Sequence, residues 1–365
     1  MKENTRPVYN FNAGPSALPL PVLEKAQQEL VNFRGTGMSV MELSHRSTPY
    51  EEVHNEAIVR FKRLFSIPAN YEVLFLQGGA SLQFSMIPMN FLNRGQKAGY
   101  IMTGSWAEKA LAEAKLFGEP YTVASTKEHN HNTIPKIEDL KYNDDDAYVH
   151  LTSNNTIYGT QWKDFPNTAN VPLIVDMSSD IMSKPIDVSK FGMIYARAQK
   201  NLGPSGVTVV IIRKDLLEQA KTEIPTMLNY NTHAKSNSLY HTPPTFGIYM
   251  LGEVLNWIEN LGGLKVIAKQ NESKANLIYE AIDGSNGFYL GHAKPESRSL
   301  MNITFKLPDE TLEKKFLDEA KAEGFVGLDG HRSVGGCRAS TYNAVPVEAC
   351  LALSKFMARF QKNNG

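Results

Sequence analysis

Short hydrophobic runs alternate with amphipathic segments along most of the chain. Seven runs are apolar and bounded by turn-forming residues, which predicts strands over 73–76, 99–103, 121–123, 147–152, 172–176, 193–198 and 207–212. The spacing of apolar residues predicts helices over 22–33, 53–65 and 106–117. Because short strands that alternate with helices are typical of a mostly parallel sheet, we expect an α/β fold.

The pattern changes after about residue 260. Long amphipathic stretches predict helices over 264–282, 312–323 and 347–360, together with a strand at 301–305. We therefore expect two domains. The large domain spans 17–260, and a smaller α+β domain combines 261–365 with the N-terminal segment 1–16.

Composition and charge narrow the class of protein. The chain has 38 basic and 38 acidic residues, so no net charge draws it to nucleic acid or to a membrane surface. Its two cysteines, Cys337 and Cys350, provide no disulfide framework, and no uncharged run approaches the ~18 residues of a membrane span. No signal peptide and no metal-ligand spacing is visible. We expect a cytoplasmic enzyme or binding protein.

The first candidate for chemistry is Lys200. It follows the apolar run 193–198, and Gly203, Pro204 and Gly206 then turn the chain before the next predicted strand. A lysine at such an edge can form a Schiff base once burial or a neighbouring cation lowers its pKa. The alternative is an ordinary solvated lysine beside a turn.

Three further features come directly after predicted strands. The turn at 78–81 opens a helix whose free N–H groups could bind phosphate, Trp106 could stack on a flat ring, and Asp176 could pair with a protonated ring nitrogen. Each also has an ordinary interpretation as a turn, a core tryptophan or a helix cap. Since strand ends meet at one edge of a parallel sheet, we expect these groups to converge with Lys200. Together they match the needs of pyridoxal 5′-phosphate (PLP).

Longer motifs extend this match over essentially the whole chain. They comprise residues 10–15, 41–47, 78–81, 103–106, 155–160, 198–201, 242–246 and 331–340. On these motifs the chain resembles the phosphoserine aminotransferase family, which belongs to the group of PLP enzymes that includes cysteine desulfurases. The resemblance implies a fold-type I PLP-dependent transferase with a large domain built on a mostly parallel seven-stranded sheet, a smaller α+β domain and a homodimer.

The resemblance also implies the cofactor contacts. They are Ala80, Ser81, Trp106, Thr156, Asp176, Gln199, Lys200, His241 and Thr242. Lys200 would be the catalytic residue and hold PLP as a Schiff base. Ala80, Ser81 and Gln199 would bind the cofactor phosphate, and His241 and Thr242 would reach that phosphate from the second subunit.

Five basic side chains form the expected substrate site, although each alone could be surface charge. They are His45, Arg46, His331, Arg332 and Arg338. The resemblance implies that Arg46 and Arg338 bind carboxylates, since guanidinium groups match them best, and that the others face the substrate phosphate. The implied reaction transfers an amino group between L-glutamate and 3-phosphohydroxypyruvate in serine biosynthesis. Whether 4-phosphohydroxythreonine is a second substrate stays open.

Two departures from the family pattern affect individual contacts. Many members have asparagine where this chain has His241, so the charge of that contact would depend on pH, and some have arginine where this chain has Ser81. Two other functions stay open: an aminotransferase for another small amino acid, and a PLP-binding regulator without catalysis. A desulfurase is disfavoured because Cys337 follows two glycines in a basic motif and Cys350 lies in a predicted helix.

Overall fold

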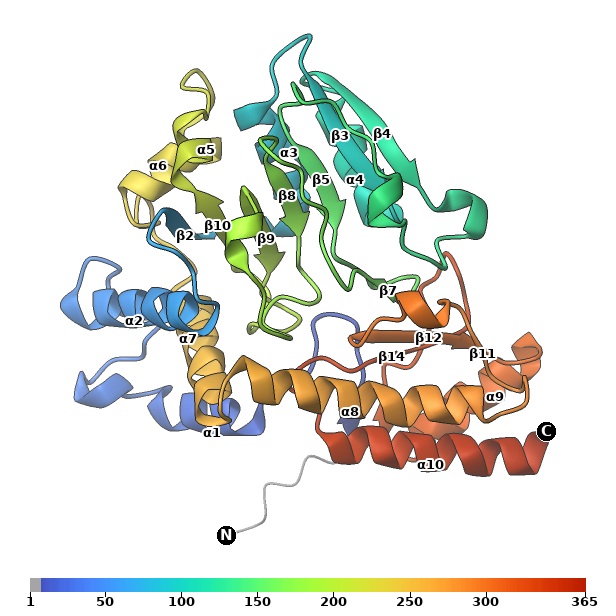
Figure 1. Cartoon of the computed structure of the whole chain (residues 1–365). Coiled ribbons are helices and arrows are strands. Elements are labelled where there is room, and N and C mark those ends of the chain that lie inside the picture. Colours follow the sequence, from blue (N-terminus) through green and yellow to red (C-terminus); the bar gives the residue numbers. More distant parts are fainter. Residues whose placement is uncertain (1–7) are drawn as a thin grey trace.

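A seven-stranded sheet forms the centre of the computed structural model, which describes residues 8–365 (Figure 1). The strand order is β2–β10–β9–β8–β5–β3–β4, and only β10 runs antiparallel to its neighbours. The strands are β2 (Tyr71–Leu76), β3 (Lys97–Met102), β4 (Glu119–Ser125), β5 (Val149–Thr152), β8 (Leu173–Asp176), β9 (Met193–Arg197) and β10 (Thr208–Arg213). All seven predicted strands are present, so the predicted α/β class with a mostly parallel sheet is confirmed.

Alternate residues of the strands enter two separate hydrophobic cores. Val73 and Phe75 of β2 pack on one face of the sheet, where α2 (Thr48–Leu64) and α7 (Thr245–Asn260) cover it. Leu74 and Leu76 face the opposite core, which α3 (Gly79–Phe91) and α4 (Ser105–Ala114) complete. Because both faces are covered, β5 and β8 are buried along their whole length, as the apolar runs require.

Several helices differ from the sequence prediction, and the short helices α5 (Lys214–Glu218) and α6 (Tyr230–Lys235) were not predicted. The helix predicted over 22–33 is α1 (Leu20–Glu29), which ends early, and Arg34 then adopts a left-handed conformation beside Gly35. The helix predicted over 106–117 ends at Ala114. Helix α7 was missed, because residues 247–255 form a continuous buried and mostly apolar stretch, which does not distinguish a helix from a strand.

The C-terminal region forms a second layer of structure. A small antiparallel sheet joins β11 (Leu290–Gly291), β12 (Asn302–Lys306) and β14 (Cys337–Ser340). It packs with α8 (Leu264–Asp283), α9 (Glu310–Ala322) and α10 (Val347–Asn364), and Figure 1 shows α8 and α10 side by side. The other short elements are β6 (Asn154–Asn155), β7 (Thr160–Gln161), α5 (Lys214–Glu218) and α6 (Tyr230–Lys235).

The N-terminal segment joins this C-terminal layer. Strand β1 (Tyr9–Asn10) pairs in parallel with β13 (Phe325–Val326), and Phe11 is fully buried in the same core as α10. These contacts support the grouping of 1–16 with 261–365. The domain boundaries themselves stay a prediction, and residues 1–7 lie outside the described part of the chain.

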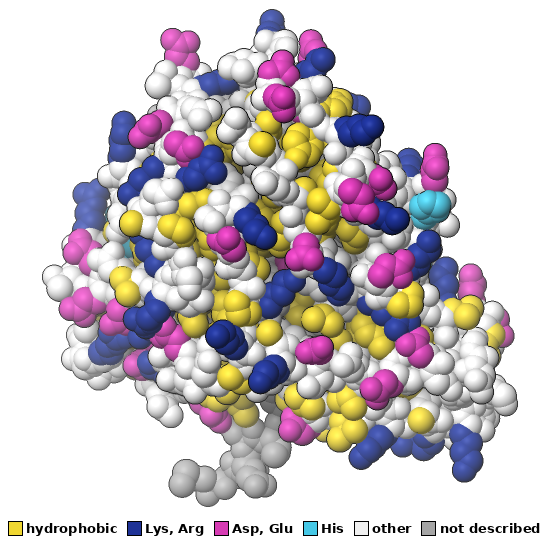
Figure 2. All heavy atoms as spheres, in the orientation of Figure 1, with side chains coloured by type: hydrophobic (Ala, Val, Ile, Leu, Met, Phe, Trp, Pro, Cys, Tyr) yellow, Lys and Arg dark blue, Asp and Glu magenta, His cyan; other side chains and the backbone are white. Residues whose placement is uncertain are grey.

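The surface shows no dominance of one charge. Figure 2 shows basic and acidic side chains interspersed over the visible face, in agreement with the net charge of zero. Over residues 8–365 no helix is both long and apolar enough to cross a membrane.

Candidate active site

Lys200 lies in the turn that follows β9, and only 8% of it is exposed. The N-terminal loop covers this turn, because the Ser16 hydroxyl donates a hydrogen bond to the Lys200 carbonyl at 2.6 Å. Burial, followed by the charge of Arg197, lowers the pKa of Lys200 from 10.5 to about 7, against the opposing charge of Asp176. The alternative of a solvated lysine is therefore wrong.

A small cavity connects Lys200 with two of the other predicted groups. Its lining consists of Trp106, Thr152, Asn154, Asp176, Ser178, Ser179, Arg197 and Lys200. Asp176 ends β8 and is 4% exposed, and its carboxylate accepts a hydrogen bond from the Ser178 N–H at 2.9 Å. Because β5, β8 and β9 end at this edge of the sheet, the predicted convergence of Lys200, Asp176 and Trp106 is confirmed.

Trp106 is held in place by a chain of hydrogen bonds that reaches the C-terminal sheet. It lies in the first turn of α4, and its indole N–H donates to the Thr156 hydroxyl at 3.2 Å. The carbonyl of Thr156 accepts a bond from the Arg338 guanidinium at 3.0 Å. Since Arg338 belongs to β14, the small sheet contributes a cation beside the cavity.

The glycine turn lies at the same edge of the sheet but outside the lining of this cavity. Gly78 and Gly79 have φ angles of 85° and 65°, and α3 begins there with its backbone N–H groups unsatisfied by any capping side chain. Ala80 is fully buried, Ser81 is exposed, and Gln199 is half-buried next to Lys200. The structure thus places these three residues at the same edge of the sheet as the cavity, without showing what they bind.

The five basic residues fall into two groups. Burial and the charges of Arg338 and Arg332 lower the pKa of His331, which therefore lies near both of them. His45 is instead adjacent to Thr242, with 3.3 Å between its Nδ1 atom and the threonine hydroxyl. Arg46 is exposed and His241 is half-buried. Among residues 8–365, no hydrogen bond joins the pair His45–Thr242 to the group around Lys200.

Sequence reasoning missed several residues of the cavity, above all Thr152 and Arg197. Each is the last residue of its strand, as Asp176 is, so the rule that singled out Asp176 also applies to them. Thr152 is 3% exposed, and its hydroxyl has no partner in the described part of the chain.

These side chains fit PLP. The buried amine of Lys200 suits an aldehyde, the Asp176 carboxylate suits a ring N–H, and Trp106 offers a flat face for stacking. The unpartnered Thr152 hydroxyl indicates that the cavity is built for a polar ligand, because buried polar groups are otherwise paired.

Comparison with known proteins also indicates a PLP-dependent aminotransferase. The family model Aminotransferase class-V matches residues 8–353. A phosphoserine aminotransferase of Lysinibacillus sphaericus (strain C3-41) is 70% identical, with 99% of each chain covered.

Solved structures agree over nearly the whole chain. One is described as radiation damage of the Schiff base in phosphoserine aminotransferase (62% identity, TM-score 0.96, 98% and 100% of the two chains covered). Another is the phosphoserine aminotransferase from Bacillus circulans subsp. alkalophilus (60% identity, TM-score 0.97, 98% and 99% covered). The chain belongs to the class-V aminotransferases and, within them, to the phosphoserine aminotransferase family.

Proposed function

We propose that this protein is a PLP-dependent phosphoserine aminotransferase, which transfers the amino group of L-glutamate to 3-phosphohydroxypyruvate and forms O-phospho-L-serine and 2-oxoglutarate. The buried Lys200, facing Asp176 beside Trp106, is the observation that carries the proposal. This arrangement explains amino transfer, and membership of the phosphoserine aminotransferase family identifies the substrates.

Three residues of the cavity have distinct tasks in this function. When bound, PLP supplies an electron-accepting ring that lets the α-carbon of an amino acid lose its proton. Lys200 holds the cofactor through its amino group, and its Nζ atom then takes up and returns the α-proton. The Asp176 carboxylate keeps a proton on the ring nitrogen. Trp106 orients the ring by stacking, and Thr156 fixes the indole through the 3.2 Å hydrogen bond.

The basic residues would select the substrates. Arg338 presents a half-buried guanidinium next to Thr156, which suits the α-carboxylate common to all substrates. His331 and Arg332, in the loop before β14, would bind the substrate phosphate. From their loop before α2, Arg46 would bind a carboxylate and His45 would face the substrate phosphate.

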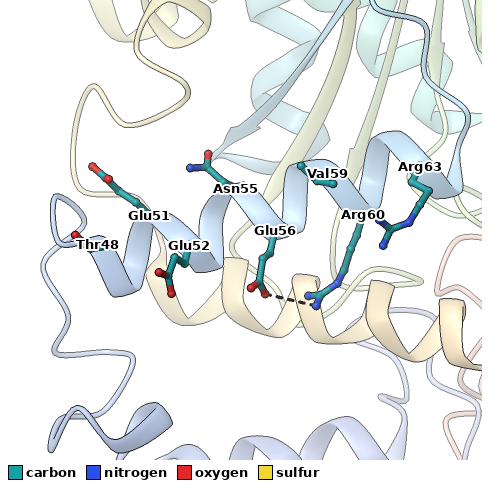
Figure 3. Close-up of a pocket in the computed structure, with 8 residues that line it drawn as sticks. All are labelled: Thr48, Glu51, Glu52, Asn55, Glu56, Val59, Arg60 and Arg63. Carbon is teal, nitrogen blue, oxygen red and sulfur yellow. Dashed lines mark ion pairs between the residues drawn. The ribbon is translucent and has the colours of Figure 1, made fainter.

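We further propose a homodimer in which the two subunits share each active site. Thr242 and His45 form a contact of their own and do not bond to their own Lys200, so they are available to a second copy. Figure 3 shows the exposed face of α2, which carries Glu51 and Glu52 near its start. Arg60 and Arg63 near its end are paired within the same chain, with Glu56 and Glu259 respectively.

The free, buried cysteines Cys337 and Cys350 support a cytoplasmic location, where thiols remain reduced.

His241 would contact the cofactor phosphate together with Thr242, and with Ala80, Ser81 and Gln199 of the other subunit.

A panel of amino acceptors tests the function. Purified protein with glutamate should convert 3-phosphohydroxypyruvate far better than hydroxypyruvate, because His331 and Arg332 match only the phosphorylated acceptor. Arg332→Gln should reduce this preference by about 10-fold or more, since a charged hydrogen bond contributes about 1.5–3 kcal/mol. Equal rates with both acceptors in the unaltered protein would contradict the substrate assignment, and full turnover by Lys200→Ala would contradict the enzyme class.

A further inference from the structure

Arg197 is the charged residue of the cavity to which the proposed function assigns no task. It is the last residue of β9 and lines the cavity together with Lys200 and Asp176. Its Cζ atom lies 5.4 Å from the centre of the Trp106 ring, and its buried Nε atom has no hydrogen-bond partner among residues 8–365. Arg197 is half-buried, and a buried cationic N–H that lacks an acceptor favours an anionic ligand, because buried polar atoms are otherwise paired.

The geometry of the sheet shows on which face of β9 the Arg197 side chain lies. Tyr195 and Arg197 lie on the same face of β9, since side chains alternate along a strand. The ring of Tyr195 contacts that of Phe84, with 6.4 Å between the ring centres, so the α3 helix packs on this face.

These contacts also show how far Arg197 lies along the strand direction relative to the start of α3. From Phe84 back to Gly79 the helix covers about 7.5 Å, and from Tyr195 to Arg197 the strand covers about 6.6 Å toward the same edge. Arg197 is therefore level with the first turn of α3, where the N–H groups around Ala80 have no capping side chain.

Both features favour an anion at the same place. Free N–H groups in the first turn of a helix bind phosphate, and a guanidinium matches phosphate oxygens with two parallel donors. Ser178 holds the strand end in position, because its hydroxyl accepts the Arg197 backbone N–H at 3.3 Å. The positive charge of Arg197 also acts on Lys200, whose pKa it helps to lower.

We propose that Arg197 is a further cofactor-binding residue, whose guanidinium binds the phosphate group of PLP beside the first turn of α3. This inference rests on the proposed cofactor. It adds a cation to the phosphate contacts that the family resemblance implies. This cation lies at the end of β9, the strand that precedes Lys200. The phosphate thereby becomes the acceptor that the buried Nε atom lacks.

A comparison of ligands with and without a phosphate group distinguishes phosphate binding by Arg197 from a general effect of the substitution on the cavity. Cofactor-free enzyme is titrated with PLP and with pyridoxal, which has the same ring and aldehyde, and binding is followed by absorbance and tryptophan fluorescence. Arg197→Gln should raise the Kd for PLP by about 10- to 100-fold more than the Kd for pyridoxal, because any change at Lys200 affects both ligands equally. Arg197→Lys should retain part of the PLP affinity, because it keeps the charge but loses the paired donors.

The control variant is Lys109→Gln. Lys109 also carries a charge over the Trp106 ring, at 4.6 Å, but does not line the cavity, so the ratio of the two Kd values should stay as in the unaltered protein. An equal loss of PLP and pyridoxal in Arg197→Gln would overturn the proposal, and so would an unchanged Kd for PLP. Arg197→Lys provides the same comparison if Arg197→Gln does not fold. Failure of the unaltered protein to bind PLP would instead contradict the proposed function.

Discussion

Lys200 owes its chemistry to its surroundings. A lysine in water has a pKa near 10.5 and is protonated at neutral pH, when it cannot act as a nucleophile. Burial in the turn after β9, together with the charge of Arg197, lowers the pKa of Lys200 to about 7. The free amine is therefore abundant at neutral pH before any cofactor binds.

The pH dependence of cofactor uptake tests this value. Cofactor-free enzyme should take up PLP at a rate that falls about 10-fold per pH unit below 7 and becomes level above it, because only the unprotonated amine reacts. Stopped-flow absorbance measures the rate. A midpoint above pH 9 would show that Lys200 has an ordinary pKa.

At the scale of elements, the start of α3 depends on two glycines that differ in their surroundings. Both have positive φ angles, which favour glycine. A Cβ atom on Gly78 would lie 2.5 Å from Leu82 Cδ2, whereas one on Gly79 would meet nothing within 4 Å. Gly78 is therefore required for space as well as for conformation.

Substitution by alanine should separate the two requirements. Gly79→Ala should lower the free energy of unfolding by about 1–2 kcal/mol, the cost of a left-handed residue. Gly78→Ala should lower it by roughly 1–3 kcal/mol more, because Leu82 must move, and should also weaken PLP binding by displacing the first turn of α3. Urea unfolding and PLP titration measure both effects. Equal losses in the two variants would contradict the role of Leu82.

Helix α2 contains a buried histidine that links stability to pH. The Nε2 atom of His54 lies 2.8 Å from the Asn237 carbonyl, and the ring packs against Phe75. Burial lowers the pKa of His54 to about 4, despite the hydrogen bond to Asn237. The unfolded chain, with a histidine pKa of 6.5, therefore binds more protons between pH 4 and 6.5, and stability falls as the pH drops through this window.

His54→Gln should flatten part of this dependence. A single histidine of this kind contributes a slope of up to about 1.4 kcal/mol per pH unit, and buried His150, whose pKa is about 3, contributes another. Urea unfolding at pH 6.5 and pH 5 gives the slope for each protein. Because the pKa values of other histidines are lowered as well, the variant should lose only the share of His54, which is at most about 1.4 kcal/mol per pH unit. An unchanged slope would mean that His54 is charged in the folded protein.

At the scale of the whole molecule, the candidate active site joins separate parts of the chain. Lys200 and Asp176 come from the large sheet, Arg338 comes from the small sheet, and Ser16 of the N-terminal loop covers Lys200. The proposed homodimer would add Thr242 and His45 from a second copy. Each part alone would lack an essential group.

Mixing two inactive variants tests whether subunits share the site. Lys200→Ala and the double variant His45→Ala/Thr242→Ala should each have little activity as separate dimers. If His45 and Thr242 act across the interface, each mixed dimer formed after unfolding and refolding together contains one intact site, so activity should return to about a quarter of the unaltered level. If they act within one chain, both sites of the mixed dimer are defective and no activity returns.

The local pattern of polar and apolar residues was sufficient to predict much of the fold and part of the candidate site. Six of the seven strands were predictable because each is a short and mostly buried apolar run, whereas the edge strand β4 is exposed to partly buried and was found from its β-branched residues. Lys200, Asp176 and Trp106 were identifiable because they follow such runs. Helix α7 was not predictable in this way, since its continuous buried stretch 247–255 is also compatible with a buried strand.

The tertiary structure alone decided which side chains are buried, how neighbouring charges shift their pKa values, and which residues far apart in the chain come into contact. The sequence determined the order of the strands along the chain and therefore which residues reach the carboxyl edge of the sheet. It did not determine that Arg197 lies over Trp106, or that Arg338 reaches Thr156 across 182 residues, because such contacts depend on how the two sheets pack. The lowered pKa of Lys200 likewise arises from desolvation, which exists only once the chain has folded around it.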